Sequence, residues 1–206
     1  MIEITPVQAR ILACLIEKEA TVPETYPLTL NSLKNACNQK SNRNPVMNLE
    51  GGEILHALNK FNENEFVSIE SGGKAFRYRH RFHKILEVDR SFLAIIAVLI
   101  LRSSQTLNEI YTRGSRIFAF ESQVEVQNIL LKMIDEKFIT MLPKESGKRE
   151  VRYVHNLCGF VEIAEEIKQS ASPMEVKVQK LEDRIDYLQD SLDDLIDIVE
   201  NLRNKK

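Results

Sequence analysis

Repeated segments predict a mainly helical α+β fold in which one small module occurs twice. The repeats comprise an apolar helix-like stretch, a strand-like stretch, and a glycine turn that leads into an aromatic and basic strand. The repeated segments occur in the same order in both copies, while the number of residues between a segment and its repeat differs from one pair to the next. A duplicated module leaves this pattern. The pairs are ILACLI at 11–16 with IIAVLI at 95–100, FVSI at 66–69 with FITM at 138–141, and GKAFRYRH at 73–80 with GKREVRYVH at 147–155.

The first module is expected to contain three helices and a β-hairpin. Thr5, Pro6 and Gln8 form a capping box with proline at the first helical position, so a helix begins at Pro6, and we expect it to end at about Glu19. Apolar residues at helical spacing predict two more helices, and alternating residues around a glycine turn predict two strands. These elements are helices at about 30–39 and 50–62 and strands at 65–70 and 75–82.

The second module carries its own helix signals. Thr106 with Glu109, and Ser122 with Glu125, are capping boxes that open its second and third helices. Its first helix, at 92–101, is apolar on every side, so we expect it to be covered on more than one face. Two interpretations remain open: the helix lies between the two domains or at a dimer contact, or it is deeply buried within one domain.

Three helices followed by a hairpin are the layout of the winged helix, in which a helix-turn-helix carries an added β-ribbon called a wing. The fold class is therefore mainly α with small β-hairpins, built from tandem winged-helix domains. We place domain 1 at 1–84 and domain 2 at 85–159, followed by a linker and C-terminal heptad helix at 160–206.

The C-terminal segment predicts a coiled coil and hence a homodimer. A capping box at 172–175 is followed by apolar residues spaced alternately four and three apart, a period that favours a two-stranded coiled coil. Self-docking of this helix is the alternative, because Ile196 and Ile198 broaden the apolar stripe. Parallel and antiparallel pairings both remain open. The expected dimer interface consists of Val178, Leu181, Ile185, Leu188, Leu192, Leu195, Val199 and Leu202.

Composition predicts a cytoplasmic protein without a membrane span. The longest apolar run, 92–101, is well short of the roughly 20 residues that a span needs, and the N-terminus shows no signal-peptide pattern. The three cysteines are widely spaced and form no CxxC pair, so neither a disulfide framework nor a zinc site is expected. The net charge of −2 is uneven, because residues 31–84 carry nine cations against five carboxylates.

A distinctive string lies within the first module. Residues 23–49, PETYPLTLNSLKNACNQKSNRNPVMNL, resemble the signature of the YceH-like family of bacterial proteins. Further matches occur at 101–102, 105–106, 146–150 and 152–153, so the resemblance covers nearly the whole chain. It implies a tandem winged-helix fold, a bacterial cytoplasmic setting and no established biochemical activity. It supplies no catalytic or binding residues.

The loop from Asn38 to Asn48 is the first candidate for function. An ordinary helix-turn-helix uses three or four residues at this point, whereas this loop has about ten, nearly all with hydrogen-bonding groups. Its amides and two cations suit contacts with phosphate, base edges or a partner's backbone. The alternative is that its asparagines cap helix ends and satisfy turns.

The wings are the second candidate. Strand alternation places Arg77, Arg79 and Arg81 on one face, where guanidiniums suit phosphate contacts, although a plain solvated strand has the same pattern. The third helix of the first module is a poor base reader, because its outward positions include Glu50 and Glu53. The expected nucleic-acid-binding residues are Lys40, Asn42, Arg43, Lys74, Arg77, Arg79, Arg81, Lys148 and Arg149.

Enzyme signatures are missing from the sequence. The four histidines form no HExxH motif, and no Walker loop or GxGxxG occurs. Cys37 with His56 could approach a metal or form a nucleophile pair, but nothing else supports such a site. We therefore expect a non-enzymatic, dimeric, DNA-binding protein in transcription regulation, with no cofactor, no metal and no catalytic residue. The alternative is a protein–protein interaction scaffold built from winged-helix domains.

Overall fold

The first helix begins where the capping pattern predicts. In the computed structural model, α1 spans Pro6–Thr21. The Thr5 hydroxyl accepts a hydrogen bond from the Gln8 backbone N–H at 3.3 Å, and the Gln8 side chain accepts one from the Thr5 N–H at 2.9 Å. These bonds satisfy donors that the start of a helix otherwise leaves free. Residues 8–16 are buried, so α1 lies at the centre of the fold.

The structure describes residues 3–71, 75–144 and 150–159. The chain divides into a unit of residues 1–160 and a unit of residues 161–206, and all of the described helices and strands belong to the first unit. The predicted coiled-coil helix with its eight interface residues lies outside the described residues. So do three predicted nucleic-acid contacts, Lys74, Lys148 and Arg149.

Residues 3–88, which we call the first half, carry a three-stranded antiparallel sheet in which β3 lies between β1 and β2. The expected strand at 75–82 ends earlier, at His80, and a short helix follows it. We did not expect β1, because two residues are too few to leave an alternating pattern. After α1, the elements are a 3-10 turn at Pro23–Thr25, β1 (Leu28–Thr29), α2 (Leu30–Cys37), α3 (Gly51–Glu63), β2 (Val67–Ser71), β3 (Phe76–His80) and α4 (Phe82–Leu86).

Residues 89–159, the second half, repeat the order of three helices followed by a two-stranded hairpin. An isolated antiparallel bridge between Gln105 and Tyr153 takes the place that the β1–β3 pair holds in the first half. Both predicted caps are present at Thr106 and Ser122. The Glu125 side chain, however, accepts a hydrogen bond from the Glu121 N–H rather than from the N–H of the cap residue Ser122. The elements are α5 (Arg90–Arg102), α6 (Leu107–Gly114), α7 (Gln123–Asp135), β4 (Ile139–Leu142) and β5 (Arg152–His155).

The junction between the third helix and the hairpin also repeats in atomic detail. Glu65 and Lys137 have left-handed φ values of 59° and 63° at matching positions. The residue after each of them, Phe66 or Phe138, donates its backbone N–H to a carbonyl five residues earlier, at 2.9 Å in both halves. These matched contacts extend the repeat beyond what the sequence shows.

The apolar helix α5 is buried along residues 92–101. It packs against α1 on one side and against α6, α7 and β5 of its own half on the other. This arrangement confirms the expectation that α5 is covered on more than one face. Because α1 and α5 are the helices that carry the ILACLI and IIAVLI repeats, the two halves meet through matching elements.

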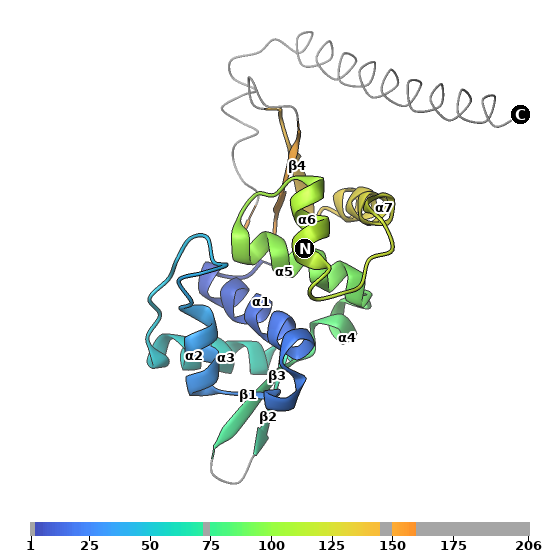
Figure 1. The fold of residues 1–206 in the computed structure, drawn as a ribbon. Helices are drawn as coiled ribbons and strands as arrows, with labels where there is room; N and C mark the ends of the chain where they lie inside the picture. Colours follow the sequence, from blue (N-terminus) through green and yellow to red (C-terminus); the bar gives the residue numbers. More distant parts are fainter. Residues whose placement is uncertain (1–2, 72–74, 145–149, 160–206) are drawn as a thin grey trace, which may run out of the picture. The chain divides into compact units, whose positions relative to one another are not determined.

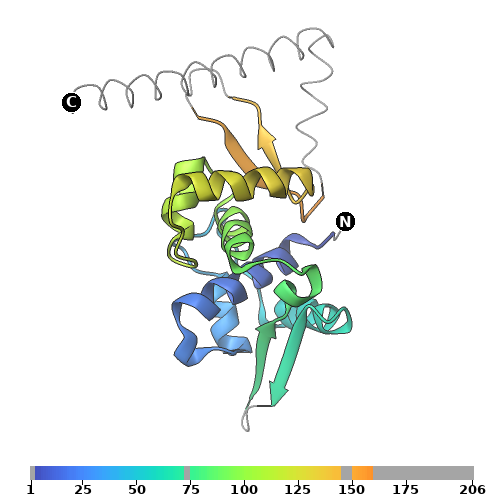
Figure 2. The same ribbon diagram turned by 90° about the vertical axis from the view of Figure 1, so that its right-hand side faces the viewer.

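Over the described residues the fold is α+β and mainly helical, as predicted, with one sheet of three strands and one of two. The ribbon of β2 and β3, which we call wing 1, and the ribbon of β4 and β5, called wing 2, extend from opposite ends of the described unit (Figures 1 and 2). The two wings therefore do not form one continuous surface.

Candidate functional site

The loop 38–48, between α2 and α3, is closed by its own polar groups. The Asn38 side chain donates to the Leu49 carbonyl and accepts from the Leu49 N–H, both at 2.8 Å. The buried Arg10 of α1 donates to the carbonyls of Cys37 at 3.1 Å and Pro45 at 2.7 Å. These contacts favour the interpretation in which the polar residues of the loop satisfy its turns.

Arg43 holds the middle of this loop against α1. Its side chain is fully buried, and its Nη2 lies 2.6 Å from Oε2 of Glu17. Its Nε also donates to the Ala36 carbonyl at 3.1 Å. Burial alone would lower the pKa of Arg43, but the hydrogen bonds with Glu17 raise it above its usual range. A guanidinium in this position stabilises the loop and is not open to a DNA phosphate, whereas Lys40 is exposed.

The loop also contacts the C-terminal end of α5. The Asn44 N–H donates to the Leu101 carbonyl at 2.7 Å, and Arg102 donates to the Asn42 side chain at 2.7 Å. The end of a helix leaves carbonyls that need partners, and the loop supplies one. The loop therefore joins the two halves of the unit.

Wing 1 carries the other sequence-predicted cations. Arg79 is paired with Glu70 at 3.0 Å and Glu19 at 3.6 Å, so its charge is largely neutralised. Arg77 donates through Nη1 to the Pro27 carbonyl at 2.8 Å and is half-buried. Arg81 lies beyond the strand, at the N-cap of α4, so the strand face expected for three arginines holds two.

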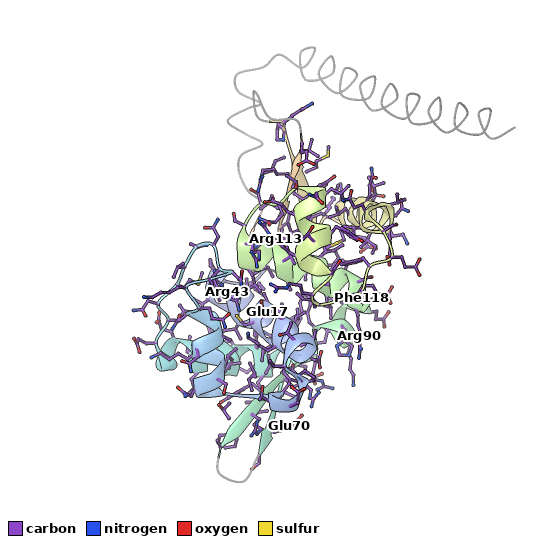
Figure 3. The ribbon with its side chains drawn as sticks, in the orientation of Figure 1. Glu17, Arg43, Glu70, Arg90, Arg113 and Phe118 are labelled. Carbon is purple, nitrogen blue, oxygen red and sulfur yellow. The ribbon has the colours of Figure 1, made fainter. Side chains whose placement is uncertain are left out.

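A polar pocket lies where the loop, the end of α5, α6 and β5 meet. Its volume is about 370 Å³, and every lining side chain is polar or charged. Figure 3 shows Arg43 and Glu17 near the loop and Arg113 on α6. The lining residues are Asn42, Arg43, Asn44, Arg102, Ser103, Ser104, Gln105, Glu109, Arg113 and Arg152.

Positive charge exceeds negative charge in this pocket. Glu109 pairs with Arg113 at 3.1 Å and with Arg152 at 2.8 Å. Burial would raise the pKa of Glu109, but the Thr106 N–H and the two arginines hold it below its usual range. One carboxylate thus faces two cations, and a third cation, Arg102, donates to the neutral Asn42 side chain.

The pocket wall includes strained backbone. Ser103 has φ 62° and ψ −155°, a conformation that glycine adopts readily and serine does not, and Asn42 has φ 61°. Strain of the Ser103 kind costs about 1–3 kcal/mol and persists where the surrounding contacts enforce it. The Gln105 side chain enforces this turn, because its Nε2 donates to the carbonyls of Arg102 at 2.9 Å and Ser104 at 2.7 Å.

The possible pairing of Cys37 with His56 is not seen. Cys37 is buried at the end of α2, whereas His56 is exposed on α3. Across residues 3–71, 75–144 and 150–159, no group of three or more His, Cys, Asp or Glu side chains is placed to hold a metal ion. Over the same residues, no helix has both the length and the hydropathy to span a membrane.

Sequence reasoning missed most of the pocket because its residues come from four separate segments. One signal was available for the loop beside the pocket: Arg10 directly precedes the apolar run 11–16, and a cation buried there needs acceptors. Glu109 was explained by its place in the Thr106 capping box, and no sequence pattern singled out Arg102 or Arg113 as site residues.

Comparisons with known proteins identify relatives across most of the chain. A family model described as "Protein of unknown function, DUF480" matches residues 4–148. A UPF0502 protein of Psychromonas ingrahamii is 42% identical over 184 residues, covering 86% of this chain and 85% of the relative. One of Vibrio campbellii is 41% identical over 189 residues, covering 87% of each. One of Azotobacter vinelandii is 44% identical over 161 residues, covering 78% of this chain and 72% of the relative.

These matches agree with the resemblance to the YceH-like family that residues 23–49 indicated. The family model covers nearly all of the first half and extends into the second as far as residue 148, so it includes the loop 38–48 and the end of α5. The chain therefore belongs to the DUF480 family of uncharacterised bacterial proteins.

Proposed function

We propose that this protein is a non-enzymatic DNA-binding regulator that contacts the phosphate backbone through wing 1. One observation carries the proposal: α1, β1, α2, α3, β2 and β3 follow the order of a winged helix. In this order the ribbon of β2 and β3 projects from one end of the unit and carries arginines (Figure 1). Pairing of two chains through residues 174–206 would present two such wings, as dimers that read two half-sites require.

The phosphate contacts are assigned to Arg77 and Arg81, with Lys40 and Lys74 as further cations. Arg77 uses only Nη1 toward described acceptors, so Nε and Nη2 are left for phosphate oxygens. Arg81 forms no ion pair with a described residue. Arg79 is not assigned, because two carboxylates already neutralise it. The affinity would then depend steeply on salt, since each phosphate contact releases counterions.

The first prediction concerns the double variant Arg77→Gln/Arg81→Gln. Its slope of log K against log [salt] for duplex DNA should fall by about two relative to the wild type, because about one unit is lost per phosphate contact. The measurement is fluorescence anisotropy of a labelled duplex in a salt titration. The matched control is Arg90→Gln/Lys132→Gln, which removes the same charge at exposed positions of α5 and α7. Equal slopes for both double variants would refute the assignment to wing 1.

A protein-interaction scaffold is the second candidate, and the surface of α7 favours it. Val124 and Leu131 lie seven residues apart on one face of α7 and are 63% and 55% exposed. The matching helix of a helix-turn-helix presents polar groups to base edges, so apolar side chains here suit a protein surface better. The loop 38–48 serves this role less well, because α5 already occupies it.

The second prediction tests this candidate in nuclease-treated bacterial lysate. A protein partner should copurify with the wild type and with Arg77→Gln/Arg81→Gln, and it should be lost from Val124→Ser/Leu131→Ser. Leu55→Ser, at an exposed apolar position of α3, serves as the control and should retain the partner. Retention by the α7 variant, or release by nuclease alone, would argue against the scaffold.

A further inference from the structure

Four arginines line the polar pocket between the two halves, and we call it the arginine pocket from here on. We propose that this pocket binds a small multivalent phosphate, such as pyrophosphate or a sugar phosphate. The site is distinct from wing 1 and does not depend on DNA binding. The proposal rests on the shape of the pocket, the balance of charge in its wall and the positions of its hydrogen-bond donors.

The size and lining of the pocket limit the ligand. A volume of about 370 Å³ holds a small molecule, at the lower end of the range for ligand sites. No aromatic or aliphatic side chain lines it, so it offers little surface against which an apolar group could be buried. A compact, fully polar anion fits this wall best.

The charges favour an anion with at least two negative charges. Among the three arginines that are not fully buried, Arg113 and Arg152 share one carboxylate, Glu109, and Arg102 has no described carboxylate within ion-pair distance. Two positive charges thus remain uncompensated after Glu17 has neutralised Arg43. A site in which positive charge is in excess attracts negatively charged ligands.

The environment of Arg102 supports this assignment. Burial lowers the pKa of Arg102, and the nearby Arg113, Arg43 and Arg116 lower it further, while Glu17 opposes them. Bringing like charges together in this way is unfavourable in the free protein. A bound phosphate would relieve the repulsion and accept paired N–H bonds from the guanidiniums, whose fork geometry matches its oxygens.

The wall is also built to stay in place. Gln105 is almost completely buried and holds the turn through two carbonyls, and its Oε1 has no described partner. The loop side of the pocket is held by Arg10 and Arg43. Because Asn42 comes from the first half and Arg102, Arg113 and Arg152 from the second, the ligand would bridge the halves.

The third prediction is that inorganic pyrophosphate binds the full chain in the absence of nucleic acid. Isothermal titration calorimetry should give one site, and at about 100 times the Kd the midpoint of thermal unfolding should rise by on the order of 5–10 °C. Hydrogen exchange in the loop 38–48 should slow on binding, because the ligand bridges this loop to α5 and α6.

Variants locate the site. Arg102→Gln/Arg113→Gln should weaken pyrophosphate binding at least about tenfold, whereas Arg90→Gln, an exposed arginine at the start of α5, should bind as the wild type does. Unliganded thermal unfolding of each variant shows whether it folds. Arg113→Gln alone provides a second test of binding. It should fold normally, because the only ion pair that it removes among the described residues is the partly exposed pair with Glu109 on the same helix.

Three outcomes would overturn the proposal. One is that the wild type does not bind pyrophosphate at millimolar concentration, and another is that the double variant binds it unchanged. A third is that the double variant loses DNA binding while the wild type ignores pyrophosphate, which would assign the pocket to a nucleic-acid backbone. Failure of the wing 1 variants to alter DNA binding bears only on the proposed function, because the calorimetric titration contains no DNA.

Discussion

Replacing Arg43 with methionine should lower the free energy of unfolding by about 3 kcal/mol. Removing one partner of a buried ion pair typically costs about 3–5 kcal/mol, because the remaining charge stays buried without compensation. Glu17 keeps some exposure and a second cation, Lys18, at 3.6 Å, so the lower end of the range applies. The Ala36 carbonyl also loses its donor. Urea denaturation monitored by circular dichroism measures the change.

An exposed pair provides the matched control. Lys34 and Glu50 form an ion pair at 2.7 Å, a separation close to that of Arg43 and Glu17. Unlike the Arg43 side chain, the side chains of Lys34 and Glu50 are both accessible to solvent. Lys34→Met should therefore cost less than about 1 kcal/mol. Equal losses in the two variants would contradict the view that burial makes the Arg43 pair important to the loop.

Truncating Leu99 to alanine should lower the free energy of unfolding by about 2–5 kcal/mol. Leu99 is completely buried in α5, and alanine would leave a cavity in the layer that both halves share. Because α5 packs against α1 as well as against its own half, unfolding should remain a single transition, displaced as a whole. Denaturation followed by hydrogen exchange in α3 and α7 measures both effects.

Leu131→Ala is the control for this prediction. Leu131 is 55% exposed on α7, so its truncation should change stability by less than about 0.5 kcal/mol. Two separate transitions in Leu99→Ala, with only the second half destabilised, would show that the halves fold independently and that the α1–α5 contact contributes little.

Local chemistry explains what could be predicted of the fold. Thr5 and Thr106 cap helices through contacts that span three residues, and such contacts are visible in the sequence. The all-round apolarity of α5 indicated that it is covered on more than one face, but not by which elements. β1 was missed because its two residues gain their structure from pairing with β3, far along the chain.

The candidate site was harder to predict, because it depends on distant residues. Nothing near Arg43 in the sequence shows that Glu17 of α1 would bury its charge. Alternation alone predicted that Arg77 and Arg79 share a face, but the carboxylate that neutralises Arg79 on the ribbon lies on the neighbouring strand. The arginine pocket forms only when α6, β5 and the loop come together around the end of α5.

The packing of α1 on α5 has a consequence for the origin of the chain. These two helices hold equivalent places in the repeat, so their contact joins one element to its own duplicate, as an interface between two copies of a single module would. A single ancestral module would have exposed this apolar helix and would have associated with another copy of itself. Carrying both copies in one chain would make such an assembly independent of protein concentration.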